Sequence, residues 1–183
     1  MSEFANLPPV RHTRLVFLAA LPFAAGLVSC SNSQFEARQP VSFRYDPGHT
    51  AHLTHGLAFP PSGAPTAVRQ AFAAANRLQT LPYKWGGGHA QLVDSGYDCS
   101  GTVSYVLRAA GFIDGSAQST EYFNYGEAGP GKWITIYARH GHVFMTVAGL
   151  RLDTGGSGGR SGPRWKPQTR DADGYVMRHP VGY

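Results

Sequence analysis

The stretch Gly96-Tyr97-Asp98-Cys99-Ser100-Gly101 decides the fold of this chain, because it marks the start of a helix with a cysteine at its head. Apolar residues at helical spacing follow, which predicts a helix from Cys99 to about Ala110, with Gly111 as its C-terminal stop. The expected buried stripe comprises Val103, Val106, Leu107 and Ala110. At a helix N-terminus, free backbone N–H groups and the helix dipole favour a thiolate over a thiol, so Cys99 is a candidate nucleophile. The alternative interpretation is a small buried cysteine that packs the helix.

Elements on both sides of this helix predict an α+β fold. A preceding helix starts at Pro65-Thr66 and stops before Pro82, since the residue before a proline disfavours helical dihedrals. Its apolar stripe is Val68, Ala71, Phe72, Ala75 and Leu78. The second half of the chain predicts strands at Trp133–Ala138, His142–Val147, Leu150–Thr154 and Tyr175–Arg178. Helices followed by an antiparallel sheet are typical of the α+β class.

A thiolate nucleophile needs a base, and histidine is the usual choice. The candidates in this part of the chain are His89, His140, His142 and His179. His142 is the best placed, because it leads directly into an apolar strand that can fix the orientation of its ring. His140 lies two residues earlier, in the expected loop, and ranks second. For any single histidine, a surface or structural role is the commoner alternative.

The base needs a polar partner that orients it, and the next strand supplies one. With Ala148-Gly149 as a two-residue turn, Val147 faces Leu150, and Asp153 becomes a diagonal neighbour of His142 on the same face. A three-residue turn would reverse the choice and present Thr154 instead. Another interpretation of Asp153 is a strand end bonded to the glycine-rich loop that follows. We favour Asp153 as the residue that orients the base.

Composition and charge exclude some classes of function. The chain has 183 residues, which suits one domain with a tail, and 42% of them are hydrophobic, which excludes a disordered polymer. The net charge of +5 comes from scattered arginines and lysines without a dense run. We therefore expect no nucleic-acid partner and interpret the charge as compatible with anionic polymers of a cell envelope.

The N-terminus has the pattern of a targeting segment. Arg11 and Arg14 precede an apolar run, residues 15–28, of signal-peptide length. The run closes with Leu-Val-Ser before Cys30, and this ending resembles the lipobox of bacterial lipoproteins. We therefore predict a lipoprotein signal peptide at residues 1–29, with lipidation at Cys30 and an exported, membrane-anchored location in the cell envelope. An ordinary secretory signal with a chance cysteine is the alternative.

Residues 30–64 are rich in proline and lack periodicity, so they are predicted to form a linker between the lipid anchor and a domain at residues 65–183. His49, His52 and His55 lie in this linker at a spacing of three. Converging imidazoles can bind zinc or copper, but no cysteine or carboxylate set completes such a site here. We interpret them as solvated histidines and expect neither a metal nor another cofactor.

Three motifs together resemble the NlpC/P60 family of cell-wall cysteine peptidases. They are Leu-Pro-Tyr-Lys-Trp-Gly-Gly at 81–87, Gly-Tyr-Asp-Cys-Ser-Gly at 96–101, and Gly-His-Val at 141–143. The resemblance runs from about residue 65 to 153. It implies a papain-like α+β fold, in which the helix that bears the nucleophile packs on an antiparallel β-sheet. It also implies hydrolysis of amide bonds in peptidoglycan stem peptides.

Carried over by position, the resemblance makes Cys99 the nucleophile and His142 the base. Tyr83 matches a tyrosine that lines the active site, and Asp98 and Ser100 flank the nucleophile as expected substrate-binding residues. The chain departs from the family at the third catalytic position, where Asp153 replaces the frequent second histidine. It also departs at residues 116–132, which lack the usual arginine- and serine-rich pattern.

Alternative functions differ in the chemistry they need. A cell-wall amidase or acyltransferase would use the same pair on a related fold. A non-catalytic wall-binding lipoprotein would need neither Cys99 nor His142. A metal-binding periplasmic protein would depend on the three linker histidines. The principal prediction is a cysteine-type peptidoglycan endopeptidase with Cys99, His142 and Asp153 at its active site.

Overall fold

Two helices and an antiparallel sheet make up most of the chain in the computed structural model, which describes residues 48–155, 161–167 and 170–183. The predicted signal peptide and the lipidation site Cys30 lie outside the described residues. The elements are β1 (His52–Thr54), β2 (Leu57–Phe59), α1 (Thr66–Arg77), α2 (Cys99–Ala109), the 3₁₀ turn η1 (Glu121–Asn124), β3 (Glu127–Ala128), β4 (Ile134–Arg139), β5 (His142–Val147), β6 (Leu150–Asp153), β7 (Arg164–Lys166) and β8 (Val176–His179).

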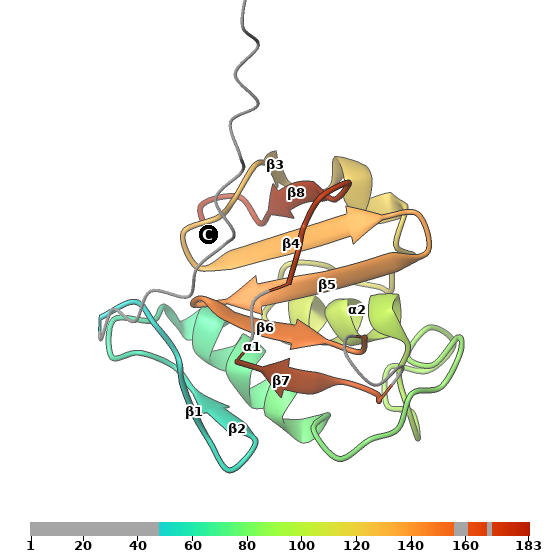
Figure 1. Ribbon diagram of the computed structural model, residues 1–183, viewed down its shortest axis with the longest axis horizontal. Helices are drawn as coiled ribbons and strands as arrows, with labels where there is room; N and C mark the ends of the chain where they lie inside the picture. The colour runs from blue at the N-terminus through green and yellow to red at the C-terminus, as the bar shows by residue number, and fades with distance from the viewer. Residues whose placement is uncertain (1–47, 156–160, 168–169) are drawn as a thin grey trace, which may run out of the picture. The chain divides into compact units, whose positions relative to one another are not determined.

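The main sheet has the order β3-β8-β4-β5-β6-β7, and every neighbouring pair is antiparallel (Figure 1). The predicted α+β class is confirmed. The two predicted helices and the four predicted strands are present, and β5 has the predicted bounds. The short strands β1, β2, β3 and β7 were not expected, because runs of two or three residues carry no period that a sequence pattern can show.

The β5–β6 hairpin has the tight turn that the pairing argument requires. Ala148 and Gly149 have φ angles of 45° and 79°, and two positive φ angles are the signature of a type I′ turn. Val147 pairs with Leu150 and Met145 with Leu152, so the predicted register is confirmed. A left-handed alanine is unfavourable, but the backbone N–H of Ala148 donates to the Trp133 carbonyl at 2.7 Å and anchors it.

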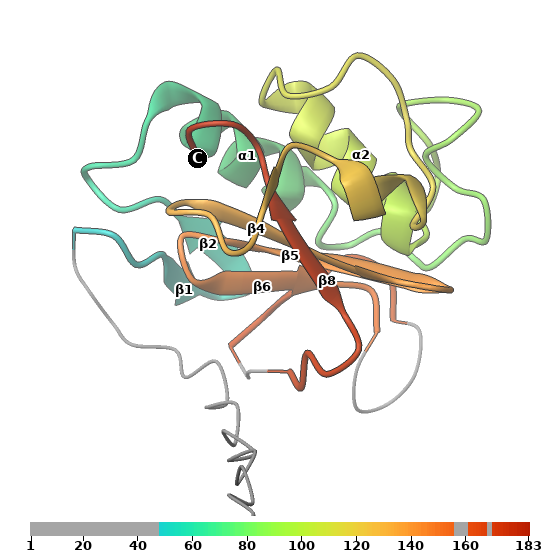
Figure 2. The ribbon, with the colours of Figure 1, turned by 90° about the horizontal axis from the view of Figure 1, so that it is seen from above.

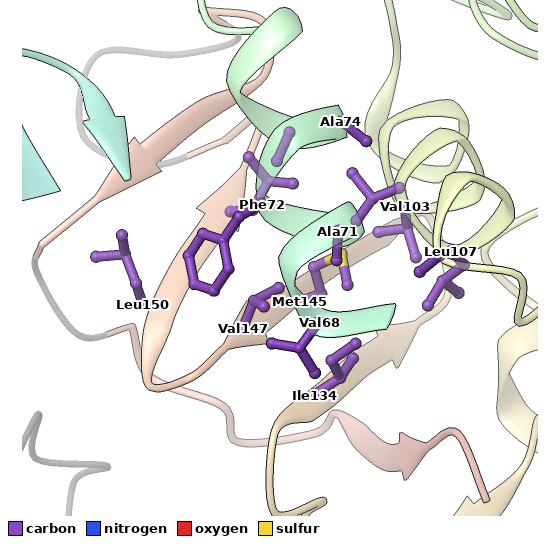
Figure 3. Close-up of a cluster of buried hydrophobic side chains, with 14 of the residues drawn as sticks. Val68, Ala71, Phe72, Ala74, Val103, Leu107, Ile134, Met145, Val147 and Leu150 are labelled. Atoms are coloured by element: carbon purple, nitrogen blue, oxygen red, sulfur yellow. The ribbon is translucent and has the colours of Figure 1, made fainter. Parts of the chain in front are cut away.

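Both helices lie on one face of the sheet (Figure 2). Val68 and Phe72 of α1 and Val103 and Leu107 of α2 meet Met145 of β5 in the core (Figure 3). Each of these side chains is at most 1% exposed. Full burial of a side chain of this size stabilises the fold by about 1.5–3 kcal/mol, so this layer holds α2 firmly against β5. None of the described helices is both long and apolar enough to pass through a bilayer.

The predicted start of the domain at residue 65 is wrong. Residues 51–59 include the β1–β2 hairpin, and both Ala51 and Ala58 are buried in the core. The N–H of Ala51 donates to the Ala148 carbonyl at 2.9 Å, and the Asn76 side chain bonds both backbone groups of Ala58. Small alanines bury little area each, so their contribution does not stand out in a proline-rich sequence. The described part of the predicted linker therefore belongs to the domain.

Candidate active site

Cys99 is the first residue of α2, as the sequence predicted, and it is partly exposed. Asp98 precedes it as the N-cap residue, with extended dihedrals and a side-chain oxygen that accepts the Gly101 N–H at 2.7 Å. The Asp98 carbonyl accepts the N–H of Thr102 at 3.0 Å. These bonds fix the first turn of α2 and, with it, the position of the thiol.

The structure shows Asp98 and Ser100 engaged by the protein itself, and their predicted role in substrate binding stays a prediction. Both residues are buried, and their polar atoms bond to the protein. Asp98 accepts the Gly86 N–H at 3.0 Å through its second oxygen. The Nε2 atom of His89 lies 3.1 Å from both Asp98 Oδ1 and Ser100 Oγ. Asp98 thus serves the backbone at the start of α2, while the Ser100 hydroxyl bonds to the side chains of His89 and Asp98.

The loop before Cys99 packs closely against the start of α2. A Cβ atom on Gly101 would lie 1.9 Å from the Gly87 carbonyl oxygen, so only glycine allows this approach. Tyr83 forms an isolated parallel β-bridge with Tyr97, which precedes Cys99 by two residues. Tyr83 is half-buried. Tyr83 therefore lies on the segment that pairs with the residues just before Cys99, and its contact with substrate stays a prediction.

His142 and Asp153 lie together across the β5–β6 hairpin. The distance between His142 Nε2 and Asp153 Oδ1 is 3.0 Å, and the Asp153 side chain is fully buried. Because an ionised carboxylate only accepts hydrogen bonds, Nε2 carries the proton and donates it to Oδ1. The Gly155 N–H donates to the same oxygen at 2.8 Å. The other ring nitrogen, Nδ1, is left for a different partner.

That nitrogen is available to the Cys99 thiol, and the interaction between the thiol and the ring changes the acidity of both groups. Burial alone would raise the pKa of Cys99, but the hydrogen bonds to His142 and to the backbone of Val143 lower it below its ordinary value. Burial likewise opposes a charged His142, while the hydrogen bonds to Asp153 and Cys99 raise the pKa of the imidazole. Both shifts favour a thiolate–imidazolium pair.

Two arginines surround the buried carboxylate. Arg170 donates to Asp153 Oδ2 at 2.8 Å, and the Nε atom of Arg151 lies 3.8 Å from the same oxygen. Burial would raise the pKa of Asp153, but the bonds from His142 and Gly155 and the charge of Arg170 hold it below its ordinary value. Asp153 is therefore a carboxylate that permanently accepts from the ring.

Four other histidines of the described residues make contacts of a different kind. His140 is exposed in the β4–β5 turn, with its ring 5.1 Å from that of Phe123. His179 bonds to the Gly129 carbonyl and to Glu127 at the edge of the sheet. His52 bonds to Thr54, and the ring of His49 packs against Trp133. Within residues 48–155, 161–167 and 170–183, no group of three or more His, Cys, Asp or Glu side chains has a geometry that suits a metal ion.

Two polar residues of this region were not predicted. His89 bonds to the N-cap residue Asp98, whereas the sequence indicated it only as one of several candidate bases. Arg170 lies 17 residues after Asp153, beyond a whole strand, and nothing in its sequence neighbourhood indicates its partner.

Comparison with known proteins gives a family model and several solved structures, two of which are described here. The model of a family described as bacteriophage peptidoglycan hydrolase matches residues 89–167, which include Cys99, His142 and Asp153. The peptidoglycan hydrolase RipB from Mycobacterium tuberculosis is 24% identical, with a TM-score of 0.49 over 68% of this chain and 70% of that one. A mutated form of the resuscitation-promoting-factor-interacting protein RipA is 24% identical, with a TM-score of 0.47 over 70% and 71%. No curated protein gives a significant match.

Proposed function

We propose that this protein is a cysteine hydrolase that cuts amide bonds in the stem peptides of peptidoglycan. One observation carries the proposal: Cys99, at the N-terminus of α2, interacts with His142, whose ring is hydrogen-bonded to the buried Asp153. Nucleophile, base and orienting acid in this order are the parts that acyl transfer requires. A cysteine that only packs the helix would need neither the ring nor the buried carboxylate behind it.

The chemistry follows from the protonation states. The Cys99 thiolate attacks the carbonyl carbon of the amide and forms a tetrahedral intermediate. The oxyanion accepts hydrogen bonds from first-turn N–H groups of α2, such as those of Cys99 and Ser100, which a helix does not use internally. The His142 imidazolium then gives its proton to the leaving amine. Water, deprotonated by the neutral imidazole, hydrolyses the thioester and returns the thiolate and imidazolium.

The substrate class rests on two observations from the sequence. The matched family model, described as a bacteriophage peptidoglycan hydrolase, spans all three residues of the proposed triad. The motifs at 81–87, 96–101 and 141–143 resemble those of NlpC/P60 enzymes, which act on the same polymer. A scattered positive charge also suits a protein that works on an anionic cell wall.

Mass analysis of fragments released from purified, insoluble peptidoglycan tests this function. We expect soluble fragments whose new ends are a free amine and a free carboxylate within the stem peptide. Release of intact stem peptides from the sugar would identify an amidase instead. Release of no fragment by the folded protein, with a known wall hydrolase as the positive control, would contradict both.

We also propose that the protein is exported and anchored to a membrane by a lipid on Cys30. The support is the sequence alone: a basic start, an apolar run of signal length and a lipobox-like ending before the cysteine. Metabolic labelling with a radioactive fatty acid should mark the full chain and leave its Cys30→Ala variant unlabelled. Equal labelling of the two would refute the anchor.

A further inference from the structure

Several cationic side chains lie near the Asp153 carboxylate. On its own strand, Arg151 lies 3.8 Å away, and on β7 its cross-strand partner is Arg164, with Lys166 opposite Arg151. The segment before β8 adds Arg170 and the phenol of Tyr175. The ring of His142 faces it from β5, with the Cys99 thiol of α2 behind the ring. The mechanism above uses only the oxygen of Asp153 that faces His142.

Arg170 holds the other oxygen. Its terminal nitrogen donates to Asp153 Oδ2 at 2.8 Å, within the range of a charge-assisted hydrogen bond. The guanidinium carbon lies 5.5 Å from the Phe144 ring centre and 5.8 Å from that of Tyr175. Contacts with two aromatic rings restrict the planar group, so it cannot swing freely away from the carboxylate.

Arg151 adds a nearby positive charge, but its Nε atom makes no hydrogen bond that would orient the Asp153 carboxylate. At 3.8 Å its Nε atom is too far from Oδ2 for a hydrogen bond, and this buried nitrogen has no partner among the described residues. The two oxygens of Asp153 are therefore divided: His142 and Gly155 bond to Oδ1, while Arg170 bonds to Oδ2. Loss of the Oδ2 bond would let the carboxylate rotate about its last torsion.

We propose that Arg170 is a positioning residue of the active site, which keeps Asp153 ionised and turned toward His142. The inference rests on the proposed function, because it assigns a task to Arg170 within the proposed triad. It predicts that Arg170 extends the acid end of the working range. Without it, Asp153 takes up a proton at higher pH, and a protonated Asp153 supports the imidazolium poorly.

The substitutions Arg170→Gln and Arg170→Lys separate this role from general stabilisation, with Arg108→Gln as the matched control. Arg108 is exposed in the last turn of α2, remote from the cysteine end. The ¹³Cγ signal of Asp153, assigned with Asp153→Asn, is followed against pH in the full chain. We expect Arg170→Gln to raise the titration midpoint by about 1 pH unit, since one close opposite charge is lost while Arg151 and Lys166 remain. Arg170→Lys and Arg108→Gln should titrate like the unmodified protein.

An unchanged midpoint in Arg170→Gln would overturn the proposal, whatever that variant does to the melting temperature. The pH profile of peptidoglycan cleavage gives the second readout: the acid limb should move up with the Asp153 midpoint and return in Arg170→Lys. An acid limb that stays in place while the midpoint moves would also overturn it. The NMR titration needs no substrate, so failure of the unmodified protein to cleave peptidoglycan would refute the proposed function separately.

Discussion

Replacement of Cys99 by alanine is expected to abolish cleavage of peptidoglycan, with a loss of at least about 10⁴-fold. The covalent intermediate cannot form without the sulfur, and the remaining backbone N–H groups of α2 have no nucleophile to assist. Cys99→Ser should be nearly as inactive, because a hydroxyl is far harder to ionise than a thiol whose pKa the His142 bond already lowers. The measurement is the rate at which soluble fragments leave insoluble peptidoglycan.

The chain offers a matched control in its other cysteine. In protein prepared without lipidation, Cys30→Ala removes a thiol that lies outside the described residues, and the purified variant should keep the full rate of cleavage. Thermal unfolding of all three variants shows whether each is folded. Cleavage by folded Cys99→Ala at the unmodified rate would eliminate the cysteine mechanism.

Replacement of His142 by alanine is expected to be almost as severe, while changes at Asp153 should cost less. His142 both raises the thiolate fraction and protonates the leaving amine, so its loss removes two functions. Asp153 only orients the ring and stabilises its charge. Its loss should cost up to about 10⁴-fold, by analogy with the aspartate of serine triads. The same fragment assay, run on His142→Ala, Asp153→Asn and Asp153→Ala, ranks the variants by their loss of cleavage rate.

The nature of the Asp153 variant decides what the residue contributes. Asparagine keeps an oxygen that can accept from Nε2, whereas alanine leaves the ring unheld and Arg170 without its buried partner. Asp153→Asn should therefore retain more activity and more stability than Asp153→Ala. Full activity in folded Asp153→Ala, with Cys99→Ala inactive, would support the cysteine hydrolase but show that Asp153 has no part in its mechanism.

The central part of the fold and the pairing of His142 with Asp153 could be predicted, because local rules decide them. A two-residue turn fixes the register of a hairpin, and the alternation of side chains then fixes which residue joins the histidine. Local sterics place the end of α1, at Arg77, before Pro82, and the cap residue Asp98 marks the start of α2 through a hydrogen bond. The catalytic roles themselves stay predictions, since geometry supports them without measuring a rate.

The remaining features depend on contacts between distant segments. Arg170 reaches Asp153 only because the segment before β8 returns to the sheet, and no pattern around residue 170 indicates this. Ala51 and Ala58 join the core through the short β1–β2 hairpin. This segment was predicted to be a linker because its composition is rich in proline. The hydrogen bonds that engage the side chains of Asp98 and Ser100 also depend on distant contacts. Their neighbours Gly86 and His89 come from the preceding loop and engage both side chains.

The central claim, that His142 activates Cys99, is tested most directly by the pH dependence of Cys99 alkylation. Iodoacetamide reacts with the thiolate, and mass analysis of the Cys99 peptide measures the rate at Cys99 apart from any reaction elsewhere in the chain. The account predicts rapid alkylation of the unmodified protein well below pH 8.5, the pKa of an ordinary thiol. In His142→Ala the midpoint should rise to or above that value, because burial of the thiol is then unopposed by the ring. The same ordinary midpoint in both proteins would contradict the claim.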